Sequence, residues 1–123
     1  MDTLKLIEGT KKVVCRVLLF SGRKDTEWTI EDVNILSRIR NLIVQAERVE
    51  STIKNEYVKL GYRGIRLEYS YTIIEIYNGI IRGVGPGEQS YQWLDKNRVL
   101  EKIIIETLPQ KHAEIKQLIE KEF

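Results

Sequence analysis

The sequence predicts an α+β fold: an antiparallel sheet of four to five strands, two main helices packed on one face, and a short C-terminal helix. Three observations predict this class. Residues 62–84 alternate apolar and polar side chains around an Asn-Gly pair, residues 30–50 repeat apolar side chains at three- and four-residue steps, and residues 96–108 carry a second such stripe. Alternation is typical of strands with one buried face, whereas the longer step is typical of amphipathic helices.

The composition is that of one ordinary globular domain covering residues 1–123. The net charge of +2 lacks the basic excess of nucleic-acid binders, so we expect no nucleic-acid partner. The single Cys15 cannot form an internal disulfide, which favours a reducing compartment. No signal peptide and no membrane-length apolar run is visible, so we expect a soluble, cytoplasmic protein without a membrane partner. Nothing in the sequence specifies an oligomeric state.

The N-terminal residues predict a hairpin. Residues 3–8 and 12–20 are rich in strand-forming residues and flank Gly9-Thr10-Lys11. The second arm is an almost continuous apolar run, so we expect a central strand covered on both faces, with Cys15 as a small buried residue. Residues 21–28 then read as a polar loop that ends in Trp28.

The first helix is expected to begin near Ile30, with Thr29 as its N-cap and Asp32 at the acidic position of a capping box. It ends near residue 50 or continues to Lys59, where Gly61 stops it.

The antiparallel ribbon predicted over residues 62–84 depends on Asn78-Gly79, because this pair between apolar runs favours a type I′ hairpin turn. A two-residue loop fixes the register, which is Tyr77 opposite Ile80, Ile76 opposite Ile81, and Glu75 opposite Arg82. The last pair places opposite charges together. Upstream, the alternation slips by one residue, which predicts either a tight turn near Tyr69-Ser70 or one long, bulged strand. The glycine-rich residues 83–87 end the ribbon.

Residues 89–93 are expected to form a short connection to the second helix. Asp95 is a suitable N-cap for a helix over 96–108, in which Ile105 falls off the apolar stripe and contacts another element. Pro109 ends this helix, and a short helix over 111–121 follows.

No catalytic residue, metal site or cofactor is predicted. One histidine, His112, and one cysteine cannot form a usual zinc site, and we expect His112 to be a solvated surface residue. Burial would leave Cys15 inert. The run Gly83-Val84-Gly85-Pro86-Gly87 lacks the lysine and helix of a phosphate-binding loop. Glu68 and Glu75 form a solvated sheet face rather than an acid–base pair.

Two segments place an arginine beside a glycine at a strand end, with an aromatic residue nearby. They supply the candidate binding residues Arg23, Trp28, Tyr62 and Arg63. Arginine can donate two parallel hydrogen bonds to a carboxylate, and loops at strand ends often bind ligands. The structural alternative is that both arginines pin loops to backbone carbonyls and that Trp28 caps the core.

The same segments resemble motifs of a family of small uncharacterised proteins that has no known activity. The run FSGRKDTEW at 20–28 resembles FSGR-Pro-Asp/Asn-Pro-x-Trp, and LGYRGI at 60–65 resembles LGYRGF. Asn78-Gly79 and the stretch from Arg98 to Thr107 match a later strand turn and C-terminal helix of that family. The chain departs from the pattern at Lys24 and Thr26, where the family has proline. The resemblance marks residues and implies no reaction.

The leading functional hypothesis is a non-enzymatic protein-binding module, of the immunity- or antitoxin-type inhibitor class, with a protein partner. Its interface would be the sheet face that the helices leave uncovered. Tyr69, Tyr71 or Tyr77 would favour binding there, because tyrosine is enriched in protein interfaces. The alternative is a small ligand-binding domain or enzyme that grips an anionic group with Arg23 and Arg63. A third option is nucleic-acid binding by helix residues Arg38, Arg40 and Arg48, which the interleaved Glu47 and Glu50 weaken.

Overall fold

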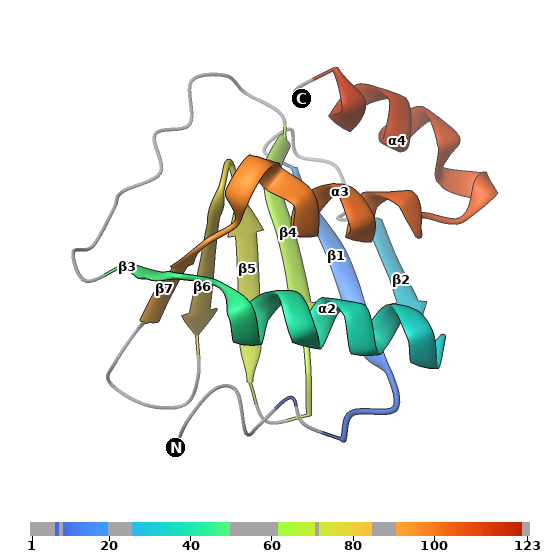
Figure 1. Cartoon of the computed structure of the whole chain (residues 1–123). Helices are drawn as coiled ribbons and strands as arrows, with labels where there is room; N and C mark the ends of the chain where they lie inside the picture. The colour runs from blue at the N-terminus through green and yellow to red at the C-terminus, as the bar shows by residue number, and fades with distance from the viewer. Residues whose placement is uncertain are drawn as a thin grey trace.

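The computed structural model describes residues 7, 9–19, 26–49, 62–70, 72–84 and 91–121, and in three of these, 19, 84 and 91, the backbone alone. The described residues form one antiparallel sheet of seven strands in the order β2-β1-β4-β5-β6-β7-β3 (Figure 1). The strands are β1 (Val13–Leu19), β2 (Thr26–Ile30), β3 (Arg48–Val49), β4 (Tyr62–Glu68), β5 (Ile73–Tyr77), β6 (Ile80–Val84) and β7 (Tyr91–Leu94). The predicted α+β class is confirmed, with more strands than the four to five expected.

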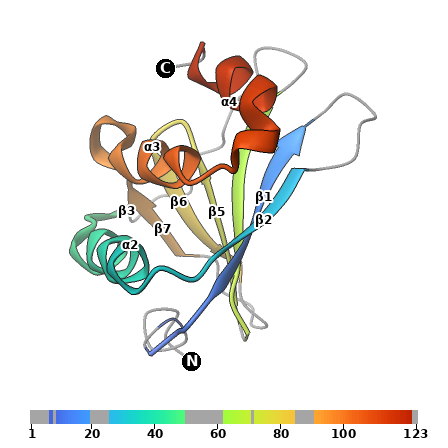
Figure 2. The same ribbon diagram turned by 90° about the vertical axis from the view of Figure 1, so that its right-hand side faces the viewer.

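The helices are α2 (Val33–Gln45), α3 (Val99–Glu106) and α4 (Ala113–Glu120), with short 3-10 turns η1 (Lys96–Arg98) and η2 (Gln110–His112). Both α2 and α3 lie on one face of the sheet, which we call the inner face (Figures 1 and 2). Alternate strand residues pack there against Leu36, Ile39 and Ile43 of α2 and Leu100, Ile104 and Ile105 of α3. Ile105, which falls off the apolar stripe of the predicted helix, is also buried. No helix among the described residues is long and apolar enough to cross a membrane.

The predicted hairpin is confirmed. Asn78 and Gly79 both have positive φ, at 48° and 87°, as a type I′ turn requires. Strands β5 and β6 pair in the predicted register, and Arg82 Nη2 lies 2.6 Å from Glu75 Oε1. Of the two alternatives upstream, the structure has the turn, because the Tyr69 N–H donates to the Thr72 carbonyl at 2.9 Å between β4 and β5.

Strand β4 also contains a bulge. Val17 pairs with Ile65 while Leu19 pairs with Tyr62, so β4 has one residue more than β1 over this stretch. Gly64 lies in the bulge with φ of +107°, and a Cβ there would approach the Ile76 carbonyl oxygen to 2.5 Å. Only glycine meets both conditions. The bulge places Tyr62 on the inner face.

The prediction that residues 21–28 form a loop is wrong for residues 26–28, which belong to β2, and residues 21–25 lie outside the described residues. Trp28 is buried opposite Cys15. Thr29 is therefore a strand residue rather than a helix cap. Asp32 caps α2 instead, because its Oδ1 accepts the Asn34 and Ile35 N–H groups at 2.8 and 3.1 Å, and the helix begins three residues later than predicted.

The predicted end of this helix is also wrong. The chain becomes extended at Ala46, and Arg48 and Val49 pair with Trp93 and Gln92 of β7. A hydrogen bond of 2.8 Å from the Leu94 N–H to the Glu47 carbonyl continues this pairing. Long-range strand pairing thus overrides helix propensity after Gln45. The predicted extension over 50–59 lies outside the described residues.

Strand β1 is internal to the sheet, between β2 and β4. Its predicted partner over residues 3–8 lies outside the described residues except for Ile7, which is helical. Val13, Cys15 and Val17 are fully buried while the alternate residues are half-buried, so the described residues cover one face of β1 completely and the other only in part. Residues 91–94 form β7 rather than a connection, and residues 85–90 are not described.

The predicted helix over 96–108 is shorter than expected and begins with the η1 turn. Asp95 nevertheless caps it, because its two carboxylate oxygens accept the Leu100 and Glu101 N–H groups at 2.8 and 3.0 Å. The helix α3 ends before Pro109, as predicted, and α4 replaces the helix expected over 111–121.

Candidate functional site

The face of the sheet opposite α2 and α3, which we call the outer face, carries a row of polar side chains across six strands. The row consists of Glu27, Arg16, Arg66, Glu75, Arg82 and Gln92, each opposite the next in the strand register. Neighbouring strands lie roughly 4.8 Å apart, so this charge row is about 24 Å long. Residues that stand opposite one another in the register project to the same face of the sheet, so these six side chains form one row.

Ion pairs connect most of the charge row. Arg16 lies 3.0 Å from Glu27 and 2.7 Å from Glu68 of the adjacent strand β4. Glu75 accepts from Arg66 at 3.3 Å and from Arg82 at 2.6 Å. The exposed fractions of the Arg16 and Arg82 side chains are 34% and 48%. Ion pairs between side chains this exposed to solvent contribute little to folding stability, on the order of 0–1 kcal/mol each.

Aliphatic side chains flank the charge row on both sides. Val14 and Leu18 stand two residues either side of Arg16 and are half-buried, as is Ile73 two residues before Glu75. Leu94, two residues after Gln92, is 39% exposed. Among the described residues, no helix covers this face (Figure 2). The outer face therefore combines apolar surface with oriented guanidinium groups.

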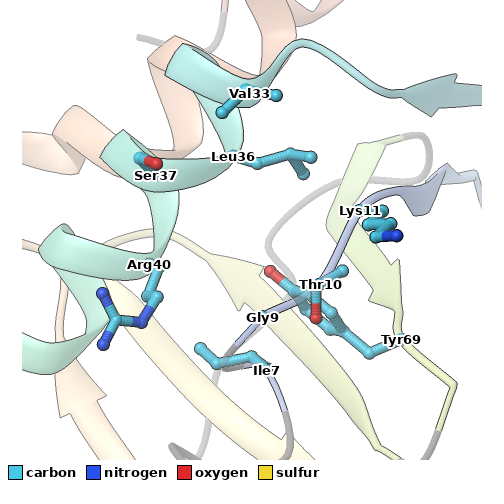
Figure 3. A pocket seen from close by; sticks show the side chains of 9 residues that line it. All are labelled: Ile7, Gly9, Thr10, Lys11, Val33, Leu36, Ser37, Arg40 and Tyr69. Carbon is cyan, nitrogen blue, oxygen red and sulfur yellow. The ribbon is translucent and has the colours of Figure 1, made fainter.

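A cavity of about 650 Å³ opens at the opposite side of the molecule, between the segment before β1, the first turns of α2 and the end of β4 (Figure 3). Lys11 and Arg40 reach it from two of these elements, and Tyr69 reaches it from the third. Burial raises the pKa of the Tyr69 phenol, which therefore stays protonated at neutral pH.

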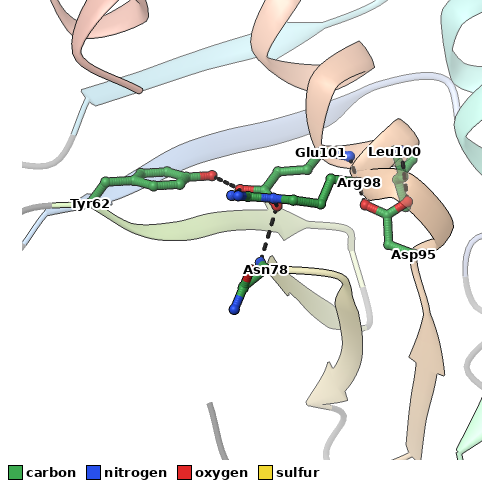
Figure 4. Close-up of polar contacts among 6 residues, drawn as sticks. All are labelled: Tyr62, Asn78, Asp95, Arg98, Leu100 and Glu101. Carbon is green, nitrogen blue, oxygen red and sulfur yellow. Dashed lines mark hydrogen bonds and ion pairs between the residues drawn. The ribbon is translucent and has the colours of Figure 1, made fainter. Parts of the chain in front are cut away.

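A buried polar cluster joins α3 to the sheet (Figure 4). Glu101 is fully buried, and both of its carboxylate oxygens accept hydrogen bonds. Oε1 accepts from the Asn78 N–H and from Arg98 Nε, each at 3.1 Å. Oε2 accepts from Arg98 Nη2 at 3.0 Å and from the Tyr62 hydroxyl. Four donors thus surround one buried charge, as burial of a carboxylate requires.

Local backbone geometry positions this cluster. Asn97 and Arg98 both have left-handed φ, at 57° and 56°, which turns the chain between Asp95 and α3 so that Arg98 faces Glu101. Burial by itself would lower the pKa of Arg98, but the hydrogen bonds and charge of Glu101 raise it overall. Burial, followed by the charge of Glu101, raises the pKa of Tyr62. Burial also raises the pKa of Asp95, against its two backbone hydrogen bonds.

The structure places two of the predicted binding residues in the architecture of the inner face. Trp28 Nε1 donates to Thr107 Oγ1 at 2.8 Å just after α3, and Tyr62 donates to Glu101 within α3. Both side chains are buried. Arg63 is half-buried next to the bulge, and Arg23 lies outside the described residues. The role of these four residues in binding stays a prediction.

Two further expectations are affected by the fold. Tyr69 is buried and lines the cavity, Tyr71 is not described, and the Tyr77 ring packs edge-on against Tyr62 with ring centroids 5.7 Å apart. In the part of the outer face that the structure describes, arginine and aliphatic residues therefore dominate rather than the tyrosines expected. Arg48 belongs to β3, so Arg38, Arg40 and Arg48 do not share one helix.

The single thiol and the single imidazole are both shielded. Burial raises the pKa of Cys15 to about 12, so its thiol is protonated and non-nucleophilic at neutral pH. His112 is half-buried, with Nε2 inaccessible, so the prediction of a solvated histidine is wrong. The described residues contain no group of three or more metal-ligating side chains.

Sequence reasoning missed Glu101 and Arg16. A glutamate inside the apolar run of 99–105 is a signal of a buried carboxylate, but its donors come from elements far apart in the sequence. Arg16 interrupts an apolar strand, and its partners become apparent only once β1 is paired with β2 and β4.

Comparisons with protein families, with curated proteins and with solved structures found no match. The resemblance to the FSGR and LGYRG motifs therefore stays a prediction.

Proposed function

We propose that the protein is a non-enzymatic protein-binding module, of the immunity- or antitoxin-type inhibitor class, and that the outer face of its sheet is the docking surface. The observation that carries the proposal is the charge row flanked by aliphatic side chains on a face that no described helix covers. Arginine is enriched at protein interfaces, where its guanidinium pairs with a partner carboxylate while its stem packs on apolar surface.

The sheet presents this surface rigidly. The charged side chains stand on strands whose opposite sides are anchored in the core, for example at Cys15, Leu67 and Ile74, which are all fully buried. Pre-ordered side chains reduce the entropy lost on association. The ion pairs within the row also orient Arg16 and Arg82 toward the neighbouring strands before binding.

The charges of the outer face set the chemistry of the partner. Arg16, Arg66 and Arg82 form ion pairs with Glu27, Glu68 and Glu75, so the paired residues of this face carry both signs in equal number. A partner must offer carboxylates and basic groups at matching positions. We therefore expect a protein partner whose association slows as salt concentration rises.

Affinity capture tests the proposal when a variant of the outer face is compared with a control variant changed elsewhere. The chain is immobilised as the wild type, as an Arg16→Ala and Arg82→Ala double variant, and as an Arg38→Ala and Lys96→Ala control. The control removes the same charge from exposed positions on α2 and η1. We expect a protein to be captured stoichiometrically from a lysate of the encoding organism by the wild type and the control, and to be lost with the outer-face variant.

Two results would contradict the proposal. One is that no protein is captured by the wild type at stoichiometric level. The other is that the outer-face variant, shown to be folded by circular dichroism, captures the same protein equally well. The alternative in which Arg23 and Arg63 grip an anionic group stays a prediction, because Arg23 lies outside the described residues.

A further inference from the structure

The two edges of the sheet differ in the protection they carry. Strand β3 ends the strand order on one side and is only two residues long. Strand β2 ends it on the other side, and its five residues, TEWTI, pair with β1 without a bulge (Figure 1). Proteins commonly protect sheet edges against pairing with short strands, prolines, lysines or bulges. Because β2 has no proline, lysine or bulge, it is the edge that can accept another strand.

The hydrogen-bonding pattern of the sheet shows how the backbone of β2 is oriented. Opposed residues of antiparallel strands alternate between pairs that exchange hydrogen bonds and pairs that do not. The Tyr69 N–H donates to the Thr72 carbonyl at 2.9 Å, which fixes this alternation between β4 and β5. Followed through β4 and β1 in the observed registers, the alternation makes Cys15 and Trp28 a hydrogen-bonded pair. The residues on either side of Trp28 therefore direct their backbone groups away from β1.

These outward backbone groups belong to Glu27 and Thr29. The same alternation, followed through β5, β6 and β7, requires a hydrogen bond between Leu94 and Glu47, and it is present at 2.8 Å. Glu27 and Thr29 are both exposed, and no described residue hydrogen-bonds to their backbone N–H or C=O groups. Figure 2 looks onto this edge of the sheet. An added strand would give each of these groups a hydrogen-bond partner.

The charges of β2 suit a second copy of the same strand in one register. Two-fold pairing that opposes Glu27 to the partner's Glu27 places like charges together, which is unfavourable. Pairing that opposes Thr29 to the partner's Thr29 has the same fault, because Glu27 then faces the partner's Glu31. When Glu27 faces the partner's Thr29, no carboxylates are opposed and every outward group of both strands is paired.

Apolar surface lies near both ends of β2. At the end where the strand begins, α4 lies beyond the edge, and Leu118 of α4 is 46% exposed (Figure 1). Just after the other end, Val33 of α2 is 74% exposed, the most of any large apolar residue that the structure describes. Antiparallel pairing places the beginning of one β2 opposite the end of the other, so α4 of each copy would lie beside the partner's α2. Contact there would remove apolar surface from water.

We propose that the protein forms a two-fold homodimer through β2, in which Glu27 of each copy lies opposite the partner's Thr29 and the two seven-stranded sheets join into one. The two-fold axis is perpendicular to the joined sheet, so both outer faces lie on the same side. The dimer does not depend on the proposed docking function, but it would offer a docking partner two equal surfaces on one assembly.

Sedimentation velocity of the full chain between about 1 and 500 µM tests the dimer, because this range covers the micromolar Kd expected of a small interface. We expect the mass to rise from one chain toward two. Thr29→Glu should weaken dimerisation about fivefold or more, and Thr29→Lys should strengthen it by a similar factor, since each acts at two symmetry-related pairs with Glu27. An unfolded variant cannot mimic the stronger dimer.

Matched variants separate this register from a general effect of charge. Ser37→Glu and Ser37→Lys make the same charge changes at an exposed position of α2 and should dimerise as the wild type does. The double variant Glu27→Lys with Thr29→Glu reverses the charges of the pair and should recover the affinity that Thr29→Glu loses.

Amide hydrogen exchange followed by NMR locates the interface. The amides of Glu27 and Thr29 should exchange several-fold more slowly at about 500 µM than at about 20 µM, because they donate to the partner strand in the dimer. The amide of Trp28 is the control, since its N–H faces β1 in both states and should not respond to concentration.

Three outcomes would overturn the proposal. The first is the mass of a single chain at every concentration, which would leave the edge of β2 to a strand of another protein. The second is a dimer whose Kd changes in the same direction in Thr29→Glu and Thr29→Lys. The third is a dimer in which the amides of Glu27 and Thr29 exchange at unchanged rates. None of these measurements involves a captured protein, so the dimer and the docking function can fail separately.

Discussion

Two arginine–glutamate pairs on opposite sides of the sheet have the same chemistry and very different surroundings. Arg98 and Glu101 meet on the inner side, where the glutamate is fully buried and four donors surround it. Arg82 and Glu75 meet on the outer face at 2.6 Å, where the arginine side chain is 48% exposed. The inner pair ties α3 to the β5–β6 turn and to the bulge in β4, whereas the outer pair lies on the surface of a single hairpin.

This difference separates residues that hold the fold from residues that are available for binding. Removing one partner of a buried pair leaves an uncompensated charge, which costs about 3–5 kcal/mol. An exposed pair contributes about 0.2–1 kcal/mol, because water solvates either charge alone. The charges of the inner side therefore serve the architecture, and those of the outer face can change partners at low cost.

The largest expected effect is at Glu101. Glu101→Ala should lower the free energy of unfolding by about 3–5 kcal/mol, since Arg98 and the Tyr62 hydroxyl lose their buried acceptor. Urea denaturation measures the change, with Glu106→Ala at an exposed position of the same helix as the control. A loss below about 1 kcal/mol, similar to that of an exposed pair, would remove the distinction between the two sides.

The bulge that brings Tyr62 to Glu101 gives the next effect. Gly64→Ala should cost about 1–3 kcal/mol through its left-handed φ, and more through the clash of the new Cβ with the Ile76 carbonyl. Gly9→Ala is the matched control, because Gly9 has a φ of +73° but no atom within 4 Å of the Cβ position. Chemical denaturation of both variants should show the larger loss at Gly64, and equal losses would mean that the close approach has no energetic weight.

The buried thiol of Cys15 should make the free energy of unfolding depend on pH. In the unfolded chain this thiol ionises near its ordinary pKa of 9.0, but burial raises the folded pKa to about 12. Its contribution is therefore complete below pH 9 and is lost as pH rises toward 12, because the unfolded chain releases the proton first. Cys15→Ala should reduce the fall in unfolding free energy over this window by up to about 1.4 kcal/mol per pH unit. Parallel pH profiles for both proteins would contradict burial of the thiol.

The smallest effect is expected on the outer face. Arg82→Ala should change the free energy of unfolding by about 0.2–1 kcal/mol, since Glu75 keeps Arg66 as a partner at 3.3 Å. The change should shrink further at high salt, which screens exposed charges. Thermal melts at low and high salt measure both quantities. A loss of several kcal/mol would mean that the outer face is part of the architecture.

Local signals predicted the local features. Asn78-Gly79 determines its own turn, and that turn determines the register of β5 and β6, so the Glu75–Arg82 pair could be read from the sequence. Asp95 and Pro109 likewise mark the ends of α3 with their own side chains.

The features that failed depend on distant partners. Residues 48–49 leave the helical pattern because β7, more than forty residues later, pairs with them. Trp28 reads as the end of a loop until β1 lies beside it. The Glu101 cluster needs β4, the β5–β6 turn and α3 together, and the charge row needs six strands in register. The cavity could not be predicted, because its walls come from three separate segments.

Double-mutant cycles on the two pairs test the central contrast most directly. Arg98→Met with Glu101→Gln, and Arg82→Met with Glu75→Gln, are each compared with their single variants by urea denaturation. We expect a coupling energy of about 2 kcal/mol or more for the inner pair and below about 1 kcal/mol for the outer pair. Equal coupling energies on the two sides of the sheet would contradict it.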